Sequence, residues 1–181
     1  MQEKYFVTKG INKLKLQEYA TEIRTFFKCN EDFMFPVLKI LDIMAYGREF
    51  NDFYYEICKD ENDFFCDNQL ALFDYNKNIL YIKESVFNEA SKDIGRARFT
   101  ICHEIAHWFL FFVYGYYPIK EVEVKPPAYE DIEWQANYLA GELLAPLKMC
   151  KGLNELDIQK VFSISPECAI VRFLQKNKWI K

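Results

Sequence analysis

Two histidines four residues apart constrain the fold of this chain more than any other feature of its sequence. They are the only histidines among 181 residues, and they begin and end the motif HEIAH at residues 103–107. A long apolar stretch surrounds the motif, so the spacing predicts a helix, on which residues four apart lie one turn apart on the same face. We expect this helix to run from about residue 93 to 114, to end at Gly115 and to lie buried at the centre of the molecule.

The side chains of this motif suit a metal centre. On one face of a helix, the imidazoles of His103 and His107 both reach a single zinc ion at about 2.0–2.1 Å. Glu104 follows the first histidine, which places its carboxylate beside a metal-bound water without making it a ligand, so it is the predicted catalytic base. The alternatives are chance placement and a pair of buried core histidines, and the combined spacing of the three residues argues against both.

The third ligand of this predicted zinc site has to be a carboxylate or a cysteine, because the chain has no further histidine. A catalytic zinc ion takes three protein ligands and leaves one position open. Glu133 is the preferred candidate, since small residues follow it and allow another helix to approach closely. Glu130 is the main rival, although its position favours a helix-start charge, and Asp131 or a cysteine are further alternatives. Asn137, one turn beyond Glu133, is predicted to hydrogen-bond a ligand imidazole.

The rest of the pattern predicts an α+β fold in which several helices pack on a small, mostly antiparallel sheet. Helical spacing marks residues 12–28, 36–46 and 129–144, and two short tail helices at 155–162 and 166–176. A hairpin is expected of 70–73 with 79–82, and 53–58 is a candidate third strand. We therefore expect one domain over 1–181, made of N-terminal helices (1–50), a small sheet (52–84), metal-binding helices (93–146) and a helical tail (153–181).

The composition excludes several classes of protein. A formal net charge of −4 argues against a nucleic-acid groove as the main working surface, so the tail helices are expected to pack rather than to read DNA. The longest apolar stretch, 108–119, contains Gly115 and Pro118 and is too short to span a membrane. The first residues lack the apolar core of a signal peptide, and the six scattered cysteines favour free thiols. We expect a cytoplasmic protein that binds neither nucleic acid nor a membrane; its oligomeric state stays open.

Three segments of the chain resemble one known family. Residues 98–107, RFTICHEIAH, resemble the R-F-T-x-A-H-E-x-x-H core of the ImmA/IrrE-type metallopeptidases. Residues 133–146 are similar to that family's E-x-x-A-N-x-F-A-x-x-L-L-M-P segment, and residues 164–173 to its V-S-x-E-A-A-x-x-R-L ending. The departures from these patterns, at Cys102, Leu139 and Ala145, touch none of the predicted ligands. The resemblance covers roughly residues 50 to 176.

The resemblance implies a zincin-like fold in which His103, His107 and Glu133 bind zinc and Glu104 catalyses peptide hydrolysis. It also implies a specific regulatory protein as the substrate, such as a helix-turn-helix repressor encoded nearby on a mobile element or in a stress circuit. For such a substrate, the extended chain at 79–84 is expected to offer an edge strand on which a peptide lies antiparallel. The alternative is a catalytically silent zinc-containing module that regulates a partner protein by binding it.

Overall fold

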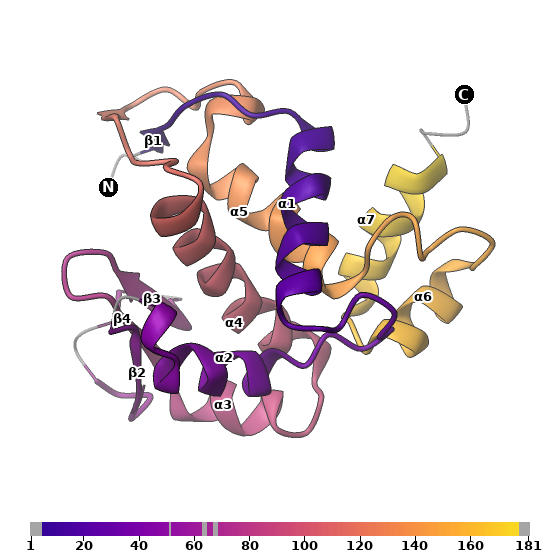
Figure 1. Cartoon of the computed structure of the whole chain (residues 1–181), viewed down its shortest axis with the longest axis horizontal. Coiled ribbons are helices and arrows are strands. Elements are labelled where there is room, and N and C mark those ends of the chain that lie inside the picture. Colours follow the sequence, from indigo (N-terminus) through magenta and orange to yellow (C-terminus); the bar gives the residue numbers. More distant parts are fainter. Residues whose placement is uncertain (1–4, 51, 63–64, 67–68, 178–181) are drawn as a thin grey trace.

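The chain folds as a set of helices with two small sheets beside them and a helical C-terminal tail, which is the predicted α+β, zincin-like class (Figure 1). This computed structural model describes residues 5–50, 52–62, 65–66 and 69–177. Each predicted helix is present within a few residues of its expected bounds. These helices are α1 (Lys13–Phe26), α2 (Val37–Tyr46), α4 (Gly95–Trp108), α5 (Ile132–Leu144), α6 (Glu155–Phe162) and α7 (Pro166–Asn177). The division of the chain into four parts stays a prediction.

Helices α4 and α5 form the centre of the molecule and pack against each other (Figure 1). Small side chains permit the close approach: the carbonyl oxygen of Ala140 lies 3.9 Å from the thiol of Cys102, and both residues are fully buried. The apolar residues that follow α4 extend it by a π-helical turn, η2 (Phe109–Val113). Gly115 then adopts a φ of +71°, a conformation that glycine takes without strain, and the helix ends there as predicted.

The predicted hairpin and third strand form one mixed sheet below this helix pair. Strand β3 (Ala71–Asp74) runs antiparallel to β4 (Ile79–Lys83), and β2 (Tyr54–Cys58) runs parallel to β4 on its other side. The strand order is therefore β2-β4-β3. The prediction that residues 79–84 offer a free edge was wrong, because β2 and β3 occupy both sides of β4. The edge strand that contacts α4 is β3.

A second, two-stranded sheet ties the N-terminal segment to the connector before α5. Strand β1 (Tyr5–Val7) pairs antiparallel with β5 (Lys120–Val122), and neither strand was predicted. Just beyond β1, the backbone N–H of Thr8 donates to the carbonyl of Glu130 at 2.9 Å. Helix α1 then packs against α5. The first residues that the structure describes therefore hold the segment from which α5 begins.

A buried arginine joins α4 to the tail. Arg98 is 2% exposed, and its guanidinium donates to the carbonyl oxygens of Phe162 and Ser163, at 3.2 and 3.0 Å, and of Phe35, at 2.7 Å. These bonds link three parts of the chain that lie far apart in sequence.

A short helix that was not predicted, α3 (Glu84–Ala90), leads from the sheet into α4.

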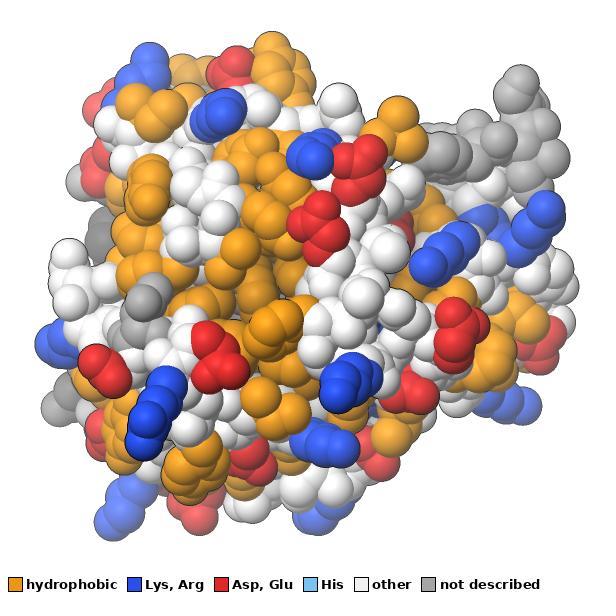
Figure 2. Space-filling view, viewed as in Figure 1, with side chains coloured by type: hydrophobic (Ala, Val, Ile, Leu, Met, Phe, Trp, Pro, Cys, Tyr) orange, Lys and Arg blue, Asp and Glu red, His pale blue; other side chains and the backbone are white. Residues whose placement is uncertain are grey.

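Charged side chains of both signs are interspersed on the face shown in Figure 2, around a central band of hydrophobic side chains. This face shows no large basic area of the kind that binds nucleic acid.

All six cysteines are unpaired. Within the part of the chain that the structure describes, no helix combines the length and apolar character needed to cross a bilayer.

Candidate metal centre

Three side chains from α4 and α5 converge on one point. The Nε2 atoms of His103 and His107 lie 3.0 Å apart. The Glu133 carboxylate approaches both, with Oε2 at 3.2 Å from His103 Nε2 and Oε1 at 3.4 Å from His107 Nε2. A tetrahedral zinc ion with bonds of about 2.0–2.1 Å requires ligand atoms about 3.3 Å apart. The three donor atoms therefore have the spacing of a zinc site, and in the described residues no other group of histidine, cysteine or acidic side chains comes close enough to hold a metal.

The start of α5 explains why Glu133 occupies this position. Asp131 caps the helix, because its carboxylate accepts the backbone N–H groups of Glu133 at 3.0 Å and Trp134 at 3.4 Å. This cap leaves Glu133 in the first turn, facing the histidines of α4. The rivals considered from the sequence lie outside the cluster: Asp131 is buried and committed to the cap, and Glu130 ends a short 3₁₀ turn, η3 (Ala128–Glu130).

Glu104 lies beside the cluster without joining it. Its Oε2 accepts the backbone N–H of Phe73, on the edge strand β3, at 3.1 Å. Both residues line a cavity of about 730 Å³ that also receives His103, His107 and Glu133. The motif thus supplies two candidate ligands, His103 and His107, and one carboxylate, that of Glu104, which the sheet holds in place.

Tyr75 is a neighbour of the cluster that sequence reasoning missed. Its hydroxyl lies 3.0 Å from Nδ1 of His107. With a metal ion bound at Nε2, Nδ1 would carry the proton of this imidazole and donate it to the tyrosine oxygen. Burial, together with the charges of Glu104 and Glu133, raises the pKa of Tyr75, so its hydroxyl stays neutral. The only signal in the sequence was an aromatic residue inside a polar hairpin turn.

Asn137 lies near His103 as the sequence suggested, but its predicted hydrogen bond stays a prediction. Its side chain lines the cavity of the cluster and contributes to raising the pKa of His103. The Nδ1 atom of His103 is buried, yet it makes no hydrogen bond of ordinary geometry to any described residue.

The charges in the cluster favour a bound cation. Burial by itself would lower the pKa of His103, but the carboxylates of Glu133 and Glu104 outweigh it and raise this pKa. Partial burial likewise opposes the charge on Glu133, yet its hydrogen bonds to both imidazoles hold its pKa below the ordinary value. The Glu133 side chain remains 61% exposed, so the cluster is open to solvent on one side. An anionic carboxylate beside two imidazoles is one of the donor sets of catalytic zinc sites.

A helix with the HExxH motif, a carboxylate from the next long helix and a small sheet beneath them define the class of HExxH metalloproteins. Within that class, the family model of the IrrE N-terminal-like domain (Peptidase_M78) matches residues 60–173. The chain belongs to this family of zinc metallopeptidases, and the resemblance seen in the sequence is confirmed. No curated protein matches the chain. The family match begins after β2, so α1, α2 and β1 lie outside it.

Proposed function

We propose that this protein is a zinc-dependent endopeptidase, with His103, His107 and Glu133 as the zinc ligands and Glu104 as the catalytic base. One observation carries the proposal: three donor atoms converge at zinc-like spacing, while Glu104 faces the same cavity and stays out of the cluster. A purely structural metal site needs the ligands but no base, so the position of Glu104 favours an enzyme.

The mechanism follows from where these side chains lie. A bound zinc ion supplies Lewis-acid chemistry, which acidifies a water molecule and polarises the carbonyl group under attack. Glu104 accepts a proton as this water attacks the carbonyl carbon, and it then delivers the proton to the amide nitrogen as the C–N bond breaks. The Phe73 backbone N–H holds the Glu104 carboxylate at one oxygen and leaves the other free for this transfer. The Tyr75 hydroxyl fixes the ring of His107.

The edge strand β3 supports a mode of substrate binding. Residues 69–73 line the cavity of the cluster, and among the described residues only β4 pairs with β3, on one of its sides. A substrate segment that adds to the open side of β3 as an extended strand would pass across the three candidate ligands. This proposal replaces the expectation that residues 79–84 receive the substrate.

We propose a specific regulatory protein, such as a helix-turn-helix repressor, as the substrate. The motivation is family analogy, which names a class of substrate and no particular protein. A net charge of −4 gives a basic DNA-binding protein a small advantage in approach. The six unpaired cysteines support a reducing cytoplasm as the place of action.

The test is to incubate the zinc-loaded protein, and its Glu104→Gln variant, with the product of a repressor-like gene next to its own. We expect one cut, found by mass spectrometry, that only the wild type makes. A proteome-derived peptide mixture provides a second substrate pool that does not depend on the choice of repressor. If neither pool is cut and both forms bind the repressor equally tightly, the silent docking module is the better description.

A further inference from the structure

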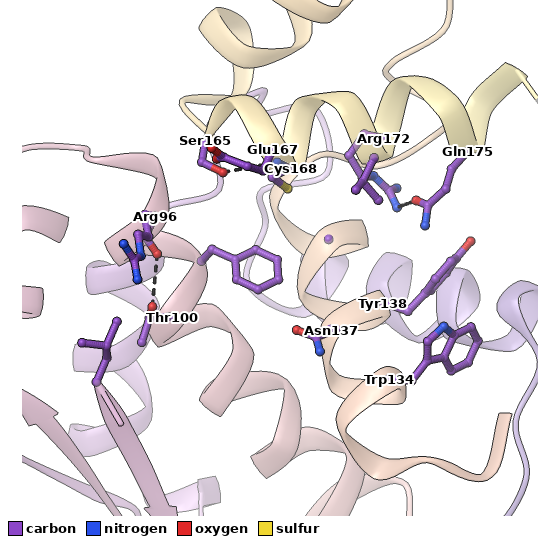
Figure 3. A pocket seen from close by; sticks show the side chains of 14 residues that line it. Arg96, Thr100, Trp134, Asn137, Tyr138, Ser165, Glu167, Cys168, Arg172 and Gln175 are labelled. Atoms are coloured by element: carbon purple, nitrogen blue, oxygen red, sulfur yellow. Dashed lines mark hydrogen bonds between the residues drawn. The ribbon is translucent and has the colours of Figure 1, made fainter. Parts of the chain in front are cut away.

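A second cavity, of about 740 Å³, lies between α4, α5 and α7. Figure 3 shows Trp134 and Tyr138 of α5 across from Arg172 and Gln175 of α7, with Thr100 of α4 on another side. A cavity of this size is in the range that binds small molecules or a few peptide side chains. The reaction proposed above assigns it no role.

This cavity adjoins the one at the metal centre. The two share Leu70, Phe99, Thr100 and Asn137 as lining residues. Phe99 and Thr100 lie one turn before His103 on α4, and Asn137 lies one turn after Glu133 on α5. A peptide that lies over the three candidate ligands can therefore continue directly into the second cavity. This adjacency favours a part of the substrate over a separate ligand as its occupant.

One wall of the cavity is apolar and uncharged. Phe99, Trp134, Tyr138 and Val171 contribute to this wall. Burial raises the pKa of Tyr138 to about 12, so this wall carries no charge at neutral pH. The same holds for the Cys168 thiol, whose pKa burial raises to about 11.

The buried charged side chain that lines this cavity, Arg172, is compensated. Arg172 and Glu142 form a buried ion pair at 2.6 Å, with both residues at most 3% exposed. At the solvent-exposed rim, Arg96 and Glu167 carry opposite charges. A charged substrate side chain would lose its hydration here without gaining a partner of its own, whereas an apolar side chain would gain from leaving water.

We propose that this second cavity is a specificity pocket, which takes a large apolar side chain, such as leucine, methionine or phenylalanine, from the substrate segment next to the scissile bond. The inference rests on the proposed peptidase function and adds the chemistry of the residue that is recognised. In a folded protein such side chains are usually buried. The substrate must therefore present this segment in an extended, locally unfolded form.

The experiment measures binding to the zinc-loaded protein by calorimetry, with three hydroxamates as probes. Acetohydroxamate reports access to the metal alone. A dipeptide hydroxamate with two leucyl side chains, and its analogue with two aspartyl side chains, report the pocket. We expect the leucyl probe to bind at least about tenfold more tightly than the aspartyl probe, since burial of one large aliphatic side chain has an effect of this size.

Val171 and Ile170 provide a matched pair of variants on α7. Both are exposed, at 49% and 44%, but only Val171 lines the pocket. Val171→Asp is expected to weaken the leucyl probe about tenfold and to leave acetohydroxamate unchanged, while Ile170→Asp changes neither. Circular dichroism checks that both variants are folded.

Two kinds of result would overturn the pocket proposal. Only the second of them would also overturn the open catalytic metal site. If acetohydroxamate binds but the leucyl and aspartyl probes bind alike, or if both variants affect the leucyl probe equally, the pocket is rejected and the peptidase proposal stands. If acetohydroxamate itself does not bind to protein that carries zinc, an open catalytic metal site is rejected, and the pocket proposal falls with it.

Discussion

Helix α4 carries two polar groups that are largely withdrawn from water, and the protein treats them in opposite ways. At its N-terminal half, the guanidinium of Arg98 is surrounded by carbonyl oxygens from three distant residues. Two turns later, His103 and His107 turn their Nε2 atoms toward each other and toward Glu133. The first group is satisfied by the backbone. The histidine cluster instead gathers acceptor atoms around a point that a cation fits. Arg98 is therefore a structural polar group, whereas the histidine cluster is a functional one.

Among the variants near these two clusters, Glu104→Gln is expected to have the largest effect, and that effect is on peptide hydrolysis. The glutamine oxygen still accepts the N–H of Phe73, so the fold and the zinc content should be unchanged. An amide cannot take up the proton of the attacking water, and we expect peptide hydrolysis to fall about a thousandfold. Zinc analysis beside a peptide-cleavage assay measures both. Cleavage at the wild-type rate would show that Glu104 is not the base.

The next effect concerns the metal itself. Purified wild-type protein should carry about one zinc ion per chain, whereas His103→Ala and Glu133→Ala should carry far less, because each variant removes one of three ligands. Adding zinc should raise the melting temperature of the wild type only, since a metal that binds the folded state stabilises it. Elemental analysis and thermal unfolding report these results. Equal zinc content in wild type and variants would reject the assigned ligands.

Arg98 should affect stability and not metal binding. Arg98→Ala leaves buried carbonyl oxygens of Phe35 and Phe162 without a donor, and we expect a loss of about 3 kcal/mol in the free energy of unfolding. Arg96→Ala, on an exposed position of the same helix, is the matched control and should cost less than about 0.5 kcal/mol. Chemical denaturation measures both. A folded Arg98→Ala protein that loses its zinc would break the comparison drawn above.

The smallest effect is expected from Tyr75→Phe. The change removes the hydroxyl oxygen that lies 3.0 Å from Nδ1 of His107 and keeps the aromatic ring. Partners of this kind orient a metal-binding imidazole, and their loss weakens metal affinity by about tenfold or somewhat more. Competition with a fluorescent zinc chelator measures the change. An unaltered zinc affinity would mean that ring packing alone holds His107 in place.

The sequence predicted those parts of the fold and site that depend on local patterns. The amphipathic spacing of α1, the apolar run of α4 and the turn between β3 and β4 were all legible, as was the pairing of His103 with His107. Glu133 was preferred over Glu130 from its neighbours on the helix, and the structure brings Glu133 to the histidines. Its role as a ligand stays a prediction.

What the sequence did not predict depends on contacts between distant segments. Strands β1 and β5 have three residues each, too few for a recognisable alternation, and they exist because they pair with each other. Helix α3 is seven residues long, below the length at which helical periodicity is distinctive. The central place of β4 required knowing that β2 pairs beside it. Tyr75 meets His107 only when the hairpin folds over α4.

The pairing of β1 with β5 has a consequence for anyone who handles this protein. Residues 5–11 bind the connector that leads into α5: Val7 bridges Asp131, and the N–H of Ile11 donates to the carbonyl of Tyr129. Asp131 is also the residue that caps the helix of Glu133. We therefore expect a fusion partner that disturbs residues 5–11 to disturb the segment that positions Glu133, a candidate ligand. Within the described residues, the C-terminal helix α7 packs mainly against α6, so we expect a tag at that end to leave this segment undisturbed.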